Sequence, residues 1–459
     1  MYFNKNIKYT KLNKKYTLYF FFLVLLSSVH AQTQSNFQFY GASQNSQSVR
    51  FQLINNLIVI PININGSPLS FILDTGVDKT ILFNLSQSDS IGLNSVEKIS
   101  LQGLGNGKSV EALLSKNNSM RIKNFASANE NIYVILKDDF DVSGKMGVTI
   151  HGIIGYRLFK HAIVEVNYKT KRIYFHNPKK FINKKCRKCE VFPLEFFRNK
   201  PYLNAQIQLD TIGNKKTDVK LLIDSGGSDA VWLFENSKSE IKTPKKHFRD
   251  ILGEGLSGTI FGNRSRIKEV SFGSFKIKNP TTSFLDSVST FYARQFKSRN
   301  GSIGGNILKR FKLWIDYPNN QITFKKNGSF RGGFEYNMSG IDVAYNGKIL
   351  IKELEKIFEG EFGNKQLEGH FNTVSFVSNY QFRFKPSYII QKVLKGSPGD
   401  LAGLQKGDII LKINDENTHQ YTLKQLLGKL QERDHKRIKM VVKRGFEVLR
   451  FEFRLVKKI

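Results

Sequence analysis

The sequence predicts a mainly β protein that contains two copies of one β-rich unit, followed by a smaller α+β domain. An apolar run followed directly by an aspartate occurs twice, in FILDTGVDKTIL and in VKLLIDSGGSDAVWLF. The two aspartates, Asp74 and Asp224, are 150 residues apart. A second pair of segments, 151–175 and 300–324, shares Gly, Ile, Tyr and Phe positions at a constant step of 149. Two long repeats at nearly one offset indicate a duplication over about 50–330.

The composition is that of a folded protein with several domains. The chain has 459 residues, of which 40% are hydrophobic and 12% aromatic, enough for two or three domains and a sizeable core. Its formal net charge is 71 − 38 = +33. The lysines are spread along the whole chain and no nucleic-acid-binding motif accompanies them, so we interpret the charge as a solvated basic surface and expect no nucleic-acid partner.

The N-terminus has the pattern of an export signal. Five lysines in the first fifteen residues precede the apolar run LYFFFLVLL (18–26), and SSVHA (27–31) ends in small residues. We therefore expect a signal peptide at 1–31, cleaved after Ala31, and a periplasmic or extracellular protein with no membrane span after cleavage. An uncleaved anchor helix is the alternative.

The two cysteines, Cys186 and Cys189, form a single CxxC in KKCRKCE. One such pair offers too few ligands for a zinc site. In an exported protein this spacing in a linker favours a local disulfide or a pair without function. The sequence suggests no metal site and no other cofactor.

Each half also has matching segments around its acid. Before it, 57–73 and 201–223 both alternate apolar and polar residues around a Gly/Asn turn, which is typical of two antiparallel strands. After it, 101–110 and 251–262 are glycine-rich and predict hairpins that either close over an extended substrate as flaps or are plain turns. The glycines expected in these flaps are Gly103, Gly105, Gly253 and Gly255.

The duplicated acids predict a catalytic pair. Two copies of one fold tend to pack about a pseudo-two-fold axis, which brings Asp74 and Asp224 face to face. Two adjacent carboxyl groups share one proton, so the ionised group can activate a water while the protonated group polarises a carbonyl. A glycine two residues after each acid allows a sharp turn of the backbone. The residue between the acid and the glycine has a hydroxyl group that can form a hydrogen bond across the axis. These supporting residues are Thr75, Gly76, Ser225 and Gly226.

Asp74-Thr75-Gly76 and Asp224-Ser225-Gly226 resemble the D-[TS]-G signature of retropepsin-like aspartic peptidases. GIIG (152–155) and SIGG (302–305) resemble the element that packs beneath each active-site loop in that family. The resemblance covers about 50–330 and implies two retropepsin-like β-barrel lobes about a pseudo-two-fold axis. Because each half has its own flap, and neither flap has a tyrosine, the chain is more similar to a fused retropepsin dimer than to a pepsin.

The resemblance also divides the chain and adds one binding residue. It implies an N-terminal lobe at 32–185 and a C-terminal lobe at 186–330. Asp78 matches the family position that contacts the substrate backbone, whereas Ser228 stands at that place in the second half. The second loop departs further from the family pattern because Gly227 replaces the usual alanine.

The remaining segment, 331–459, resembles a PDZ domain through its GSP, AGL and GD motifs within 393–418. Its pattern predicts a short helix that starts at Ser397-Pro398, contains Ala402 and ends at Gly403, an amphipathic helix at 422–431 and a hairpin at 437–455 that turns at Arg444-Gly445. The resemblance implies a C-terminal peptide ligand on a glycine-rich loop, for which MSGIDV (338–343) is the best match. The alternative is a module that only packs or positions.

Taken together, these patterns predict an exported, monomeric aspartic endopeptidase that acts on extended polypeptides. A peptide-binding protein of the same fold that does not cleave, or a scaffold built around the PDZ domain, is the alternative. Most Asp-x-Gly sequences are ordinary turns, and only the repetition at matched positions distinguishes these two.

Overall fold

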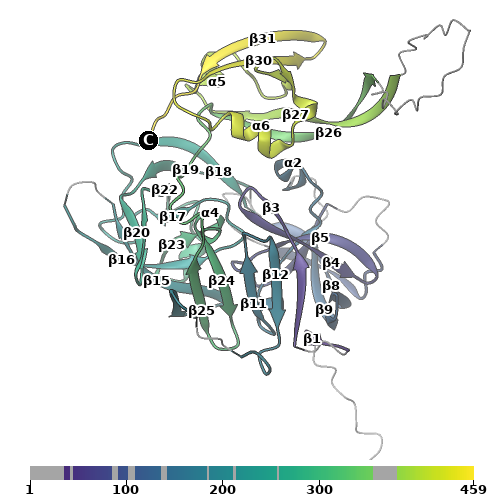
Figure 1. Ribbon diagram of the computed structural model, residues 1–459, viewed down its shortest axis with the longest axis vertical. Helices are drawn as coiled ribbons and strands as arrows, with labels where there is room; N and C mark the ends of the chain where they lie inside the picture. Colours follow the sequence, from purple (N-terminus) through teal and green to yellow (C-terminus); the bar gives the residue numbers. More distant parts are fainter. Residues whose placement is uncertain are drawn as a thin grey trace, which may run out of the picture.

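The computed structural model describes residues 36–41, 45–84, 91–101, 109–135, 142–182, 186–209, 213–255, 258–354 and 380–459. The expected signal peptide and the glycines Gly103 and Gly105 lie outside these residues. Figure 1 shows two β-rich lobes with a smaller C-terminal domain above them, and the predicted mainly β fold is confirmed. None of the helices in the described ranges is long and apolar enough to span a bilayer.

The N-terminal lobe is built on one large sheet. Its described strands run in the order β1-β9-β6-β10-β5-β4-β8-β7, with β3 paired to β4. Short helices α2 (Val142–Met146) and α3 (Tyr156–Phe159) flank β10 in the sequence. The strands are β1 (Gln38–Phe39), β3 (Gln52–Ile54), β4 (Leu57–Ile64), β5 (Ser67–Leu73), β6 (Thr80–Leu82), β7 (Val96–Leu101), β8 (Val110–Ile122), β9 (Phe125–Ile135) and β10 (Gly152–Ile154).

The C-terminal lobe repeats this arrangement. Its described strands run in the order β18-β19-β22-β17-β23-β16-β15-β20-β21, with β14 paired to β15. The helices α4 (Gly305–Leu308) and η1 (Ala293–Gln295) belong to it. The strands are β14 (Glu195–Phe197), β15 (Lys200–Gln208), β16 (Thr217–Ile223), β17 (Val231–Phe234), β18 (Phe248–Gly255), β19 (Gly258–Arg266), β20 (Glu269–Phe272), β21 (Phe275–Lys278), β22 (Thr281–Leu285) and β23 (Arg299–Ile303).

The duplication is visible in the strand order and in the strand directions. The run β9-β6-β10-β5-β4 in one lobe matches β22-β17-β23-β16-β15 in the other. In both runs the first pair and the third pair are parallel and the others antiparallel. The two copies inferred from the sequence therefore fold in the same way.

A third sheet joins the lobes about a pseudo-two-fold axis. Its order is β13-β25-β24-β11-β12-β2, with the first three strands from the second copy and the last three from the first. At its centre Glu165 is paired with Trp314, its own counterpart at the step of 149, so the axis passes through this pair. The strands are β2 (Ser46–Arg50), β11 (Ile163–Asn167), β12 (Arg172–His176), β13 (Cys189–Pro193), β24 (Phe311–Asp316) and β25 (Gln321–Lys326).

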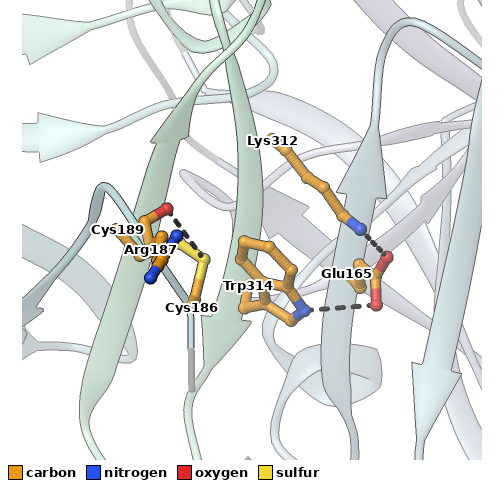
Figure 2. Close-up of a disulfide and its surroundings, with 6 residues drawn as sticks. All are labelled: Glu165, Cys186, Arg187, Cys189, Lys312 and Trp314. Carbon is orange, nitrogen blue, oxygen red and sulfur yellow. Dashed lines mark hydrogen bonds and ion pairs between the residues drawn. A yellow bond between two sulfur atoms is a disulfide. The ribbon is translucent and has the colours of Figure 1, made fainter. Parts of the chain in front are cut away.

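Figure 2 shows how side chains support this joint. The Glu165 carboxylate accepts hydrogen bonds from Lys312 Nζ at 2.6 Å and from Trp314 Nε1 at 3.1 Å, both from the other copy. Nearby, Cys186 and Cys189 form the local disulfide that their spacing favours, where the chain enters β13. One apolar cluster, which includes Val164, Leu313 and Phe324, runs through both lobes.

The C-terminal domain has its own apolar core, which includes Ile390, Leu426 and Met440. Its described strands run in the order β26-β27-β28-β30-β31, with β29 paired to β28. The elements are β26 (Ile341–Leu354), β27 (Tyr380–Val393), α5 (Pro398–Leu401), β28 (Ile409–Ile413), β29 (Glu416–Asn417), η2 (Thr418–Gln420), α6 (Leu423–Lys429), β30 (Arg437–Arg444) and β31 (Glu447–Arg454).

The local signals read from the C-terminal sequence have clear structural causes. The Ser397 side chain caps α5, and Thr422 with Gln425 forms a capping box on α6. The prediction that the first of these helices contains Ala402 was wrong by one residue. The helix ends at Leu401 with Ala402 as its C-cap, because Gly403 then adopts a φ of +94°.

Candidate active site

Asp74 and Asp224 occupy equivalent places at the ends of two central strands. Asp74 follows β5, and its backbone N–H donates to the carbonyl of Ile154 at 2.8 Å. Asp224 follows β16, and its N–H donates to the carbonyl of Ile303 at 3.0 Å. In each lobe the strand that supplies this carbonyl lies parallel to the strand that carries the acid. Both acids directly follow the last residue of an apolar strand, and each is only partly exposed.

The glycines of GIIG and SIGG lie directly beneath the acidic loops. A Cβ atom on Gly155 would lie 2.3 Å from the carbonyl oxygen of Asp74, and one on Gly304 would lie 2.7 Å from that of Gly227. These distances are shorter than any real Cβ contact, so only glycine lets the supporting segment approach each loop.

The hydroxyl groups of Thr75 and Ser225 link the two loops, and both residues are buried. Thr75 Oγ1 donates to the carbonyl of Ile223 at 2.6 Å and accepts from the N–H of Ser225 at 2.9 Å. Reciprocally, Ser225 Oγ donates to the carbonyl of Leu73 at 2.8 Å and accepts from the N–H of Thr75 at 3.0 Å. Four hydrogen bonds related by the pseudo-two-fold axis therefore fix one loop relative to the other.

Each carboxyl group lies against the loop of the other copy. Gly76 N–H donates to Asp74 Oδ1 at 2.6 Å, and Gly226 N–H donates to Asp224 Oδ1 at 3.2 Å. A Cβ on Gly226 would lie 2.2 Å from Asp74 Oδ2, and one on Gly76 would lie 3.0 Å from Asp224 Oδ1. The structure thus brings the two sequence-predicted acids together between the lobes.

This position changes their protonation. Burial, followed by the negative charge of Asp224, raises the pKa of Asp74 from 3.8 to about 7. Burial also raises the pKa of Asp224, although the charges of Arg299 and Lys200 and the backbone N–H groups of the loop act in the opposite direction. A pair of this kind can share one proton between its two carboxyl groups.

Two family models match parts of the chain. Residues 60–158 match the family model described as aspartyl protease, and residues 389–444 match the model described as PDZ domain. The chain contains an aspartyl protease domain followed by a PDZ domain. Among solved structures, it is similar to the crystal structure of aspartic proteinase from Irpex lacteus, with 11% identity over 63% of this chain and 99% of that chain and a TM-score of 0.40. No curated protein matches the chain.

Two cations beside the dyad of this aspartyl protease domain were missed in the sequence. Lys200 begins β15, and the charges of Asp78, Asp74 and Asp224 oppose the lowering of its pKa by burial. Arg299 begins β23, is only 4% exposed, and places its guanidinium 4.9 Å from the centre of the Phe234 ring.

The signal for both cations was a difference between the copies. Lys200 stands at the start of β15, where the matching strand β4 starts with Leu57. Arg299 lies 149 residues after Ile150, which is fully buried and apolar. Comparing the repeats for shared residues cannot reveal Lys200 or Arg299, because each of them occurs in only one repeat.

The positions of Asp78 and Ser228 differ in their surroundings. Asp78 is partly exposed, with Lys79 Nζ at 3.4 Å and the charge of Lys200 nearby. The backbone carbonyl of Ser228 instead accepts a hydrogen bond from Asn56 Nδ2 at 2.8 Å, across the two lobes. The contact of Asp78 with a substrate backbone stays a prediction.

The strands that flank both predicted hairpins are paired, although residues 102–108 of the first hairpin lie outside the described residues. Strands β7 and β8 are antiparallel, with Leu101 paired to Val110. Strands β18 and β19 form the second hairpin, in which Gly255 is paired with Gly258 and Gly253 has a φ of +155°. Closure of these hairpins over a substrate stays a prediction. Within the described ranges, no three His, Cys, Asp or Glu side chains are grouped as metal ligands would be.

Proposed function

We propose that this chain is an exported aspartic endopeptidase that hydrolyses peptide bonds within extended polypeptides. The observation that carries the proposal is the Asp74–Asp224 pair, held between the lobes by four loop-to-loop hydrogen bonds and with the pKa of Asp74 raised to about 7. Such a pair provides a base and an acid at the same pH without a cofactor.

The proposed reaction needs only the shared proton. The ionised carboxylate removes a proton from a water molecule, and the water oxygen attacks the carbonyl carbon of the scissile peptide bond. The protonated carboxyl group gives its proton to the carbonyl oxygen, which yields a tetrahedral gem-diol. One hydroxyl of the gem-diol then returns its proton to the ionised carboxylate, and the proton taken from water passes from the dyad to the leaving nitrogen. The C–N bond breaks, and the dyad again holds one proton.

Two features support the finer parts of the proposal. The export pattern at 1–31 supports a periplasmic or extracellular location. A hairpin on each lobe supports an extended substrate, because strand-like hairpins can pair with the main chain of a peptide. Both acids belong to one chain, so the proposed enzyme acts as a monomer.

The test is peptide cleavage by the mature chain, starting at Gln32, against a diverse peptide mixture from about pH 3 to about pH 8, the range that spans plausible dyad titrations. Asp74→Asn and Asp224→Asn are each expected to lower cleavage by about 100- to 10,000-fold, the size of a general acid–base contribution. Pepstatin is expected to inhibit the wild type. The matched control is Asp218→Asn, an exposed carboxylate on β16 that accepts a hydrogen bond from Gln206 Nε2 at 2.9 Å.

Cleavage that survives in either dyad variant would show that a different site or a contaminant is responsible. No cleavage at any pH would favour the non-cleaving peptide-binding protein. For the location, the N-terminal residue of protein recovered outside the cytoplasm is expected to be Gln32, and a cytoplasmic protein that starts at Met1 would contradict export.

A further inference from the structure

The PDZ domain has one face where a peptide could add to its sheet. Strand β26 is at the end of the sheet order, so its outer edge pairs with no other strand in the described part of the chain. Helix α6 packs beside β26, and the loop that contains Gly340 leads into it. PDZ domains bind extended peptides at an edge strand of this kind.

In this chain that face is covered by the N-terminal lobe. Helix α2 packs against β26, and Figure 1 shows α2 directly below β26 and α6. Lys145 Nζ of α2 lies 3.6 Å from Asp342 Oδ2, near the start of β26. A Cβ on Gly147 would lie 2.9 Å from Cβ of Leu423, the first residue of α6. One short segment therefore touches both sides of the face.

The same segment is firmly attached to the lobe that provides it. Met146 is buried in the apolar cluster of that lobe, and Val142 packs against the same cluster. The backbone carbonyl of Lys145 accepts a hydrogen bond from Asn55 Nδ2 at 3.0 Å. Because these contacts attach α2 to the N-terminal lobe, they also hold Lys145 and Gly147 in place against the PDZ domain.

The PDZ domain also holds the hairpin of the other lobe. Lys392 Nζ of β27 donates to Thr259 Oγ1 of β19 at 2.6 Å. The ring centres of Phe248, at the start of β18, and Tyr336 lie 5.4 Å apart. Phe248 packs against the PDZ core itself. The domain is thus in contact with α2 of one lobe and with the β18–β19 hairpin of the other.

The chain between the protease lobes and the PDZ domain is also fixed. Arg310 is 2% exposed and donates from Nη2 to the carbonyl of Gly333 at 2.8 Å. Its guanidinium lies 3.7 Å from the ring centre of Phe334. A linker held in this way keeps the PDZ domain close to α2, so that docking is an intramolecular event with a high effective concentration.

We propose that the β26–α6 face of the PDZ domain is a docking surface for the chain's own segment Val142–Gly147, and not an open groove for a separate peptide. The complementary charges of Lys145 and Asp342 and the absence of a side chain on Gly147 select this occupant. Through Lys392 and Thr259, the docked domain joins the α2 side of the N-terminal lobe to the hairpin of the C-terminal lobe.

The experiment is hydrogen exchange of the full mature chain, read by mass spectrometry in segments 142–147, 341–345 and 423–427. Gly147→Asn introduces a Cβ against Leu423, and asparagine tolerates the φ of +67° at this position. Exchange in all three segments is expected to become at least about tenfold faster, in keeping with loss of local protection. The matched control is Gly66→Asn, where φ is +93° and no atom lies within 4 Å of a Cβ.

A second variant tests the docking from the PDZ side. Asp342→Lys places two positive charges together and is expected to speed exchange in 142–147, although the substitution lies in the other domain. Its control is Asp415→Lys, which removes an exposed carboxylate that pairs with Lys439. The proposal is overturned if Asp342→Lys leaves 142–147 as protected as in the wild type, or if Gly147→Asn affects 142–147 alone. Exchange reports docking whether or not the dyad cleaves peptides.

Discussion

The two active-site loops share their hydrogen bonds across the axis and differ in the side chains that surround them. Each begins at the end of a strand, and each carries a hydroxyl that donates to the opposite strand and accepts from the opposite loop. The acids, the glycines that follow them and the glycines beneath them are all duplicated. Interactions across the axis need both partners, and this requirement keeps the copies equivalent there, with a hydroxyl in each loop.

The surroundings of the two loops have diverged. Lys200 and Arg299 lie beside the dyad on the second copy, where the first has Leu57 and Ile150. In the second copy Ser228 stands in the place of Asp78, and its backbone carbonyl accepts a hydrogen bond from Asn56 of the other lobe. A duplicated single chain can thus place a charge beside the dyad in one copy only, which a homodimer cannot do.

The largest difference between the loops is expected at their glycines. Gly226→Ala forces a Cβ to 2.2 Å from Asp74 Oδ2, whereas Gly76→Ala brings one only to 3.0 Å from Asp224 Oδ1. We expect Gly226→Ala to lower kcat/KM by at least about 100-fold, the lower range of an acid–base contribution. The decrease in kcat/KM caused by Gly76→Ala is expected to be at least about tenfold smaller. Steady-state cleavage of one fluorogenic peptide measures both. Equal losses would mean that the loops are equally crowded.

The hydroxyl pair tests the symmetry of the joint. Thr75→Val and Ser225→Ala each remove two hydrogen bonds and leave buried backbone groups without a partner. We expect each to lower the free energy of unfolding by about 2–4 kcal/mol, and by similar amounts in the two copies. Urea unfolding with matched m-values measures the loss. If one variant is nearly neutral, the two hydroxyls are not equivalent.

The cation beside the second copy is expected to set the upper pH limit. With the pKa of Asp74 at about 7, cleavage should decline as pH rises through about 7, because the shared proton is lost. Lys200 favours the ionised dyad, so Lys200→Met should raise the dyad pKa and move this decline upward by up to about one pH unit. The measurement is kcat/KM against pH, with Lys216→Met as control, since Lys216 precedes β16 and pairs with Glu269. An unchanged or lower limit would remove Lys200 from the electrostatics of the site.

The parts of the molecule that repeat could be predicted from the sequence, because the offset between Asp74 and Asp224 carries three-dimensional information. Two copies of one fold imply an axis, and an axis implies that matched residues meet. The hydroxyl links follow from the same argument, whereas the position of GIIG beneath its loop was predicted from the resemblance to retropepsin-like peptidases. Lys200 and Arg299 could not be found in this way, since each lacks a counterpart.

The PDZ domain shows a second limit. Its caps and glycine turns are local, and the sequence places them to within one residue, as Ala402 illustrates. The cover over β26 is formed by Val142–Gly147, which is about 200 residues away in the sequence and has no motif of its own. Contacts between domains depend on how their surfaces meet, and no short pattern records that.

The smallest expected difference is at His151 and Asn300, which lie one step apart in the repeat. His151 Nδ1 accepts from the N–H of Ser70 at 3.1 Å, and Asn300 Oδ1 accepts from the N–H of Lys220 at 2.9 Å. Two different side chains thus have the same structural role, because each accepts a hydrogen bond from the backbone of the strand that leads to the acid. His151→Asn should keep this bond and change the free energy of unfolding by less than about 1 kcal/mol, whereas His151→Ala should cost about 1 kcal/mol or more.

Activity measured beside stability separates this structural task from a chemical one. We expect kcat/KM of His151→Asn to stay within about twofold of the wild type, because the histidine holds β5 and does not reach the dyad. Asn300→His is the reciprocal variant and should be equally mild. A loss of about tenfold or more in His151→Asn, with unfolding unchanged, would mean that the imidazole takes part in the reaction and that the two copies differ in chemistry as well as in surroundings.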